Sequence, residues 1–243
     1  MMSILPDSER SSRIAHLAQL SRRDAGRTRM TRAVLGLAFA LIVILYIVSM
    51  MYSRFGGLTV AVDPYQMEQY ALSLCETPDF SAPTSALNAR ASAHITNISE
   101  YDLPADIDHI NGLHAGDHYL AYTFYLTNAG DSEVTFEYEV LLQNVTQNLD
   151  SALRVRLYED GEPTTYAKTR SDGGGAEDGC AEFLSSTVIA RKQVTAFAPG
   201  DIKKYTIVLW LEGNDADCVD ALIGGTLKTA MMFSVIDGEE SDA

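Results

Sequence analysis

Two patterns of hydrophobic and polar residues divide this chain. Near the N-terminus, residues 33–53 form a run of 21 residues without a charge, which Arg54 interrupts. As a helix this run rises about 31 Å, enough to cross a hydrocarbon core of roughly 30 Å. From about residue 91, apolar residues instead alternate with polar ones, as in strands with one buried face. The patterns predict one transmembrane helix followed by a β-rich domain.

The alternation predicts several strands that are joined by short turns. Asn128-Ala-Gly-Asp-Ser132 and Ala198-Pro-Gly-Asp201 have the composition of such turns. No convincing helix follows residue 91, so we expect an all-β ectodomain, an antiparallel two-sheet β-sandwich that is jelly-roll-like. The predicted strands are 120–126, 134–142, 153–157, 186–197, 202–211 and 225–236.

The same patterns predict the domain organisation. Residues 54–90 read as a juxtamembrane linker, with a short helix over Pro64–Glu76. The five expected segments are a cytoplasmic basic tail (1–32), a transmembrane helix (33–53), the linker (54–90), the β-sandwich ectodomain (91–238) and an acidic tail (239–243).

Charge predicts the orientation of the anchor. Residues 1–32 carry seven arginines against three acidic side chains, whereas 11 basic and 30 acidic side chains follow from Arg54 onward. The positive-inside rule places the N-terminus in the cytoplasm and the C-terminus outside the cell membrane, with residues 33–53 in the lipid bilayer. The acidic ectodomain should repel nucleic acid. Cleavage near Ala61, giving a secreted product, is the alternative; the missing small-x-small signal after the apolar run favours retention.

The last third of the chain carries a distinctive combination of motifs. Pro199-Gly-Asp201 precedes a strand, and Trp210-Leu-Glu-Gly213 leads through an acidic loop to the closing apolar strand that ends at Val235. In these motifs the chain resembles the TasA/camelysin-like group of bacterial cell-surface proteins over about residues 110–236. The resemblance implies a jelly-roll ectodomain and a role in surface or matrix structures. Camelysin also implies a metallopeptidase, but the chain has no His-Glu-x-x-His motif.

The acidic loop is a candidate calcium site. Oxygen ligands at short spacing suit Ca²⁺, and we take Asp215, Asp217 and Asp220 as the candidate ligands, with Glu212 and Asn214 beside them. The spacing does not follow the EF-hand pattern. A solvated acidic turn without a metal is the other interpretation.

Histidines and cysteines supply the remaining candidates. His109, His114 and His118, preceded by His94, are the residues that a camelysin-type zinc site would use, although surface loop histidines explain them as well. Of the three cysteines, we expect Cys180 and Cys218 to form a disulfide, because both lie in loops that flank the same predicted strands.

These features together predict a protein that is not an enzyme. We assign no catalytic residue and no cofactor other than the candidate calcium. The predicted function is a membrane-anchored surface protein with a structural or protein-interaction role, in which an exposed edge strand binds a surface partner or a second copy. Leu58-Thr-Val-Ala-Val62 is a candidate donor strand if the anchor is cleaved. The alternatives are a camelysin-type metallopeptidase and a calcium-dependent adhesion module.

Overall fold

The structure, a computed structural model, describes residues 34–44, 57–90 and 96–236, in two units, Met1–Ser53 and Arg54–Ala243. In the first unit residues 34–44 are helical. No helix among the described residues is both long and apolar enough to span a membrane. The tail 1–32, the acidic tail 239–243 and residues 33 and 45–53 of the expected anchor lie outside the described residues, so these predictions stay predictions.

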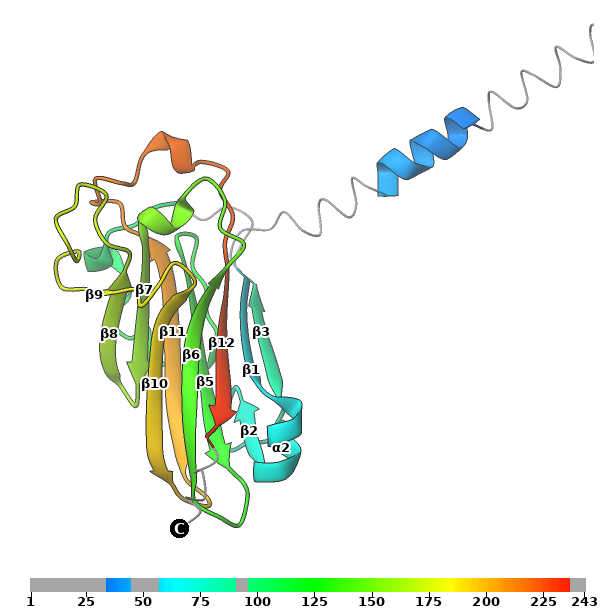
Figure 1. The fold of residues 1–243 in the computed structure, drawn as a ribbon, viewed down its shortest axis with the longest axis vertical. Coiled ribbons are helices and arrows are strands. Elements are labelled where there is room, and N and C mark those ends of the chain that lie inside the picture. The colour runs from blue at the N-terminus through cyan, green and yellow to red at the C-terminus, as the bar shows by residue number, and fades with distance from the viewer. Residues whose placement is uncertain (1–33, 45–56, 91–95, 237–243) are drawn as a thin grey trace, which may run out of the picture. The chain divides into compact units, whose positions relative to one another are not determined.

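The second unit consists of two β-sheets (Figure 1). The five-stranded sheet has the order β10 (Val188–Phe197), β6 (Val134–Gln143), β12 (Lys228–Val235), β1 (Gly57–Val62) and β3 (Ala86–Arg90). The seven-stranded sheet has the order β2 (Leu72–Cys75), β5 (Tyr119–Asn128), β11 (Ile202–Leu211), β7 (Leu153–Glu159), β8 (Glu162–Ala167) and β9 (Ala181–Glu182), with β4 (Gly112–Leu113) also paired to β5.

Among the described residues of this unit, helical structure is limited to short segments. They are α2 (Pro64–Tyr70) and the 3₁₀ turns Glu100–Asp102, Leu149–Ser151 and Asp220–Leu222. The prediction of a β-rich, two-sheet fold is thus confirmed in its coarse form. Both sheets are mixed rather than purely antiparallel, because β1 runs parallel to β12 and β8 runs parallel to β9.

Residues 57–90 differ most from the expectation. They contribute β1, β2 and β3 to the sheets instead of forming a linker. In β1, Leu58, Val60 and Val62 are buried and alternate with more exposed residues, which is the period of a strand with one buried face. The expected helix over Pro64–Glu76 ends at Tyr70, because Ala71 has a positive φ of 54° and β2 follows directly.

The core lies between the two sheets and is rich in aromatic rings. Phe233 of β12 lies with its ring centroid 5.4–6.2 Å from four other rings, Phe124, Phe136, Tyr138 and Tyr205. Phe124 and Tyr205 belong to the seven-stranded sheet, whereas Phe136 and Tyr138 belong to the five-stranded sheet. Phe233 therefore joins the two layers at the centre of the core.

The seven-stranded sheet is also covered on its outer face. Ile107, Ala121, Val208 and Trp210 form a second buried cluster there, and Trp210 is 1% exposed. Ile107 comes from the segment between β3 and β4, so this largely irregular segment covers the sheet. This second layer explains why most of β5, and β11 from Tyr205 to Leu211, are buried.

One buried amide joins two turns at the same end of the sheets. Asn128 is fully buried, and its Nδ2 donates to the carbonyls of Ser132 and Phe197 at 2.9 and 2.8 Å. Its Oδ1 accepts from Gly130 N, and its own carbonyl accepts from Gly200 N. The Asn-Ala-Gly and Pro-Gly-Asp turns that the sequence singles out are therefore held together by one side chain.

Replacing the ring at the centre of the core should cost the most stability. We expect Phe233→Ala to lower the free energy of unfolding by about 3–5 kcal/mol, because it removes contacts to both sheets and leaves a cavity. The neighbouring Met232 is 36% exposed, so Met232→Ala should cost less than about 1 kcal/mol. Urea unfolding followed by fluorescence of the single tryptophan measures both; equal losses would contradict this account.

Candidate functional site

The acidic loop that follows β11 is built around a buried carboxylate. Glu212 is 8% exposed and accepts three hydrogen bonds: from Trp210 Nε1 at 3.0 Å, Glu100 N at 3.0 Å and Asn214 N at 3.1 Å. Two backbone hydrogen bonds join the same two segments: Ile98 N donates to Leu211 O, and Gly213 N donates to Ile98 O. Without this carboxylate the amide N–H groups of Glu100 and Asn214 and the indole N–H would lose their partner. Glu212 therefore stabilises the position of the segment between β3 and β4, which covers the outer face of the seven-stranded sheet.

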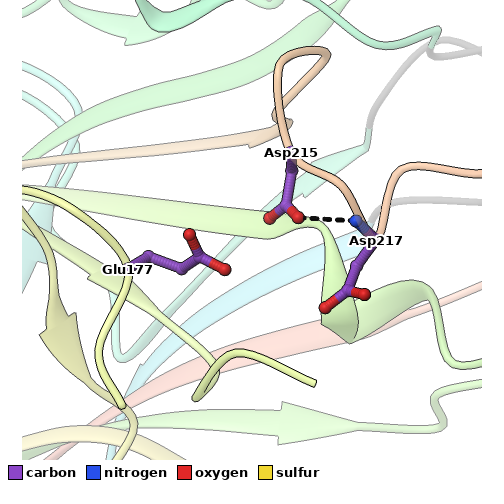
Figure 2. A group of neighbouring side chains, drawn as sticks. All are labelled: Glu177, Asp215 and Asp217. Carbon is purple, nitrogen blue, oxygen red and sulfur yellow. Dashed lines mark hydrogen bonds between the residues drawn. The ribbon is translucent and has the colours of Figure 1, made fainter. Parts of the chain in front are cut away.

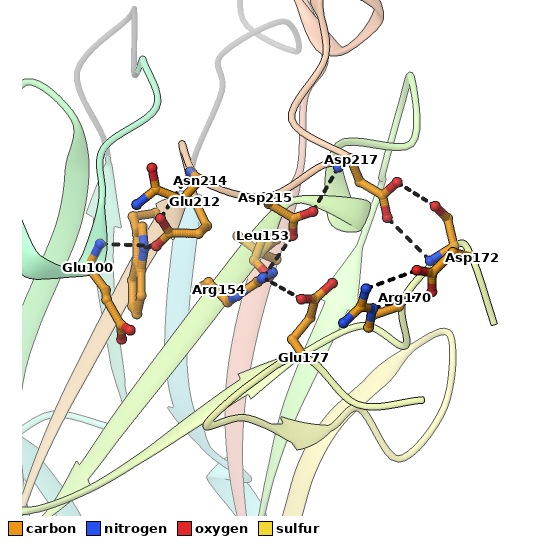
Figure 3. A network of polar contacts seen from close by, with 12 residues as sticks. Glu100, Leu153, Arg154, Arg170, Asp172, Glu177, Glu212, Asn214, Asp215 and Asp217 are labelled. Atoms are coloured by element: carbon orange, nitrogen blue, oxygen red, sulfur yellow. Dashed lines mark hydrogen bonds and ion pairs between the residues drawn. The ribbon is translucent and has the colours of Figure 1, made fainter. Parts of the chain in front are cut away.

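An ion pair lies beside this carboxylate. The side chain of Arg154, on β7, is 6% exposed, and its Nη2 lies 2.7 Å from Asp215 Oδ2 and 3.4 Å from Glu177 Oε2 (Figure 3). The Asp215 side chain is 2% exposed, so this ion pair is buried. Removing either partner would leave the other charge buried without a counter-ion, which lowers the stability of the fold.

Arg156, two residues further along β7, contacts the tryptophan from the same strand. Its guanidinium carbon lies 5.1 Å from the Trp210 ring centroid, and its Nη2 donates to Glu100 Oε2 at 2.9 Å. The contact is a cation–π interaction of the kind that is stronger where water is excluded. The two arginines of β7 thus fasten the acidic loop and the 3₁₀ turn at Glu100 to the sheet.

Three carboxylates meet at the end of this network. One oxygen each from Glu177, Asp215 and Asp217 lies within 4.8 Å of the others, and Figure 2 shows the three side chains converging from two loops. Asp217 N donates to Asp215 Oδ1 at 2.7 Å, while Ser171 donates to Asp217 through both its backbone N and its hydroxyl. Among the described residues this is the group with the geometry to hold a cation.

The candidate calcium ligands are only partly brought together. Asp215 and Asp217 belong to the three-carboxylate group, whereas Asp220 begins the next 3₁₀ turn as an exposed residue and Glu177 takes the third place. Arg154 already supplies a positive charge to two of the three carboxylates. A calcium ion, with ligand distances of 2.3–2.6 Å, would have to compete with that guanidinium.

The charge balance at this group has a consequence for Glu177. Partial burial, followed by the nearby Asp215 carboxylate, raises the pKa of Glu177 above its usual value. The folded chain therefore holds this proton more strongly than the unfolded chain, so the carboxyl lowers stability as pH rises through and above its usual titration range. A bound cation would remove this penalty, which is the electrostatic argument for calcium.

The histidines do not converge. His109 is exposed beside Asp108, and His118 Nδ1 contacts the hydroxyl of Thr96. His114 has its two ring nitrogens 2.8 Å from Gly112 O and 2.6 Å from Ile107 O, so both face carbonyl oxygens. His94 lies outside the described residues. The zinc arrangement expected for a metallopeptidase is therefore not assembled from the described histidines.

The cysteines differ from the expected pairing. Cys75, Cys180 and Cys218 are all free thiols in this structure, where the sequence analysis expects a bond between Cys180 and Cys218. Cys75 is buried in β2, and Cys218 Sγ accepts from Asn97 Nδ2 at 3.4 Å.

Sequence reasoning missed the residues that tie the network together. Arg154 and Arg156 alternate with apolar residues along their strand, and Glu177 lies in a glycine-rich stretch, so none of them stands out as a site residue in the sequence. The available signal was charge: two arginines on one strand of a strongly acidic domain indicate buried or paired partners. Which acids they meet depends on loops that are distant in sequence.

Comparisons with known proteins add little to this geometry. The chain matches no protein-family model and no curated protein. Among solved structures, a β-glucosidase from Kluyveromyces marxianus in complex with glucose is similar at 11% identity and a TM-score of 0.23. That similarity covers 66% of this chain and 15% of the β-glucosidase chain, and it carries no argument about function.

The buried carboxylate should matter more than its exposed neighbour. We expect Glu212→Ala to lower the free energy of unfolding by about 2–3 kcal/mol and to shift the Trp210 emission maximum, because the indole N–H loses its charged hydrogen-bond partner. Asp220→Ala, in the same loop but exposed, should stay within about 0.5 kcal/mol of the wild type. Urea unfolding and emission spectra measure both effects; a Glu212→Ala variant with unchanged stability and emission would contradict the assigned role.

Proposed function

We propose that this chain is a membrane-anchored cell-surface protein with a structural or protein-interaction role. In this proposal residues 33–53 cross the membrane, residues 1–32 face the cytoplasm and the unit Arg54–Ala243 faces outward. The arginine-rich tail and the acidic second unit support that orientation. The resemblance of residues 110–236 to TasA/camelysin-like proteins supports a jelly-roll surface module of a bacterial envelope or matrix.

The observation that carries the proposal is the contrast between the two edges of the five-stranded sheet. β10 bears Arg191 and Lys192, has two register irregularities against β6, and includes Ala196 at a φ of 58°. Charges and bulges of this kind prevent an edge from pairing with another strand. β3, at the opposite edge, pairs in continuous register with β1 from Ala86 to Arg90.

The outer edge of β3 is therefore available to a partner. None of the residues that the structure describes pairs with it. An exposed edge of this kind binds an extended strand through main-chain hydrogen bonds, which is a common mode of protein recognition. In the acidic loop after β11, Glu212 and Asp215 accept hydrogen bonds from groups of the same chain. These bonds stabilise the fold, which supports a structural role for the loop.

Localisation tests the proposal directly. We expect the full-length chain, expressed in a bacterial host, to appear in the membrane fraction at its full intact mass and to be digested by protease added to intact cells. Ala40→Arg with Ile44→Arg, which puts two charges inside the apolar run, should release it from the membrane. A product starting near residues 54–62 in the medium would contradict the anchor and favour a secreted fibre subunit, whereas a cytosolic product would contradict the proposal as a whole.

A calcium-dependent adhesion module is the second candidate, and the three-carboxylate group favours it. It predicts a rise of several degrees in melting temperature with millimolar Ca²⁺, which Asp215→Ala with Asp217→Ala abolishes. The leading proposal predicts no such rise, because Arg154 Nη2 already contacts Asp215 and Glu177 and would compete with a cation. Calorimetry with Ca²⁺ or with chelator decides between the two, and the zinc content of the same sample tests the metallopeptidase alternative: stoichiometric zinc would favour it.

A further inference from the structure

We infer that two copies of this chain pair through their β3 strands, antiparallel about a two-fold axis at Asn88. The inference rests on the proposed function, in which the β3 edge is a docking surface, and it names the partner as a second copy. Such pairing would join two five-stranded sheets into one continuous sheet. The interaction is isologous, so the same short segment must be complementary to itself.

The side chains of β3 meet that requirement on the inner face. Leu87 and Ala89 point into the core, where they are 9% and 1% exposed. A two-fold axis at Asn88 sets Leu87 of one copy across from Ala89 of the other. A large side chain thus faces a small one, and the apolar row under the sheet continues into the second copy.

The outer face is complementary as well. Ala86, Asn88 and Arg90 are exposed, and the axis sets Arg90 of each copy across from Ala86 of the other. No like charges lie directly opposite one another, which is the arrangement that cross-strand pairs require. Each Arg90 also lies toward the end of the other copy's β1, where Asp63 follows the strand.

Charge argues for this edge over other surfaces of the chain. The whole chain has a formal net charge of −15, so two copies repel wherever acidic surfaces approach each other. Residues 86–90 contain no acidic side chain and carry one arginine. β3 is therefore a strand at which a second acidic copy can approach without direct repulsion.

The remaining edges of the two sheets are less suitable. β2 is flanked by Thr84, whose backbone exchanges hydrogen bonds of 2.9 and 2.8 Å with Leu74. β9 is two residues long, and β10 has the charges and bulges described above. Among the described strands, β3 combines an open edge, a regular register and self-complementary side chains.

Position 88 gives the sharpest test, because it faces itself across the axis. Asn88→Asp and Asn88→Lys each place two like charges about 5 Å apart between Cβ atoms. Asn88 is exposed, and Asp at this position keeps the acceptor for the Thr59 hydroxyl, which now donates to Asn88 Oδ1 at 3.1 Å. Native mass spectrometry and sedimentation of the full-length chain in mild detergent measure the dimer.

We expect the wild type to dimerise in a concentration-dependent way, and each variant to dimerise at least 10-fold more weakly. An equimolar mixture of the two variants should recover dimers that contain one copy of each. A monomeric wild type, variants that dimerise like the wild type, or a mixture that recovers nothing would each overturn the inference. Gln193→Asp and Gln193→Lys on β10 are the matched controls and should leave the dimer unchanged.

A second pair of variants keeps the test valid if the Asn88 variants fold poorly. Ala86→Glu should strengthen the dimer, because the new carboxylate faces Arg90 of the other copy, while Ala86→Arg should weaken it. Effects of equal sign would overturn the inference. Failure here is distinct from failure of the proposed function: a monomeric chain found at the cell surface overturns the pairing alone, whereas a cytosolic chain overturns the surface role.

Discussion

Burial of both faces of the seven-stranded sheet is the constraint on which the other features depend. Its inner face packs on the five-stranded sheet, and its outer face carries Trp210 and Val208. A sheet with two apolar faces needs a second cover, and here the irregular segment around Ile107 provides it. Such a segment has few regular backbone hydrogen bonds of its own, so its position depends on side-chain acceptors and donors. Glu212 and His114 fulfil that need by bonding backbone groups of the covering segment.

Six strands after residue 119 could be predicted because their alternation is local, whereas β8 and β9 were not among the predicted strands. Val134 to Leu142 reads as a strand with one wet face, and β6 has that burial pattern. Trp210 carried a further signal: it is out of phase with Ile207 and Leu209, and the structure buries it on the opposite face. The alternation alone allowed a second layer, a neighbouring molecule or solvent on that side, and the structure places a second buried cluster there. Residues 57–90 were harder, because β1 pairs with β12 about 170 residues away and short alternating runs resemble linker sequence.

The candidate site was predictable only within one loop. Asp215 and Asp217 are two residues apart, so their proximity follows from the sequence alone. Glu177 and Arg154 reach them from other elements, and no local pattern encodes such meetings. Asp220 was included for its spacing, but the backbone turns into a 3₁₀ segment there and separates it from the group. Spacing along the chain predicts ligands well in one continuous loop and poorly once a turn intervenes.

The position of β1 also bears on how the chain can be processed. Gly57 to Val62 lies between β12 and β3, with Leu58 and Val60 buried in the core. Cleavage near Ala61 would remove most of this strand, leave two strand edges unpaired and expose the apolar row beneath them. Cleavage before Gly57 would keep every strand of the sheet. A stable secreted form of this fold must therefore begin before β1, unless a strand from elsewhere fills the gap.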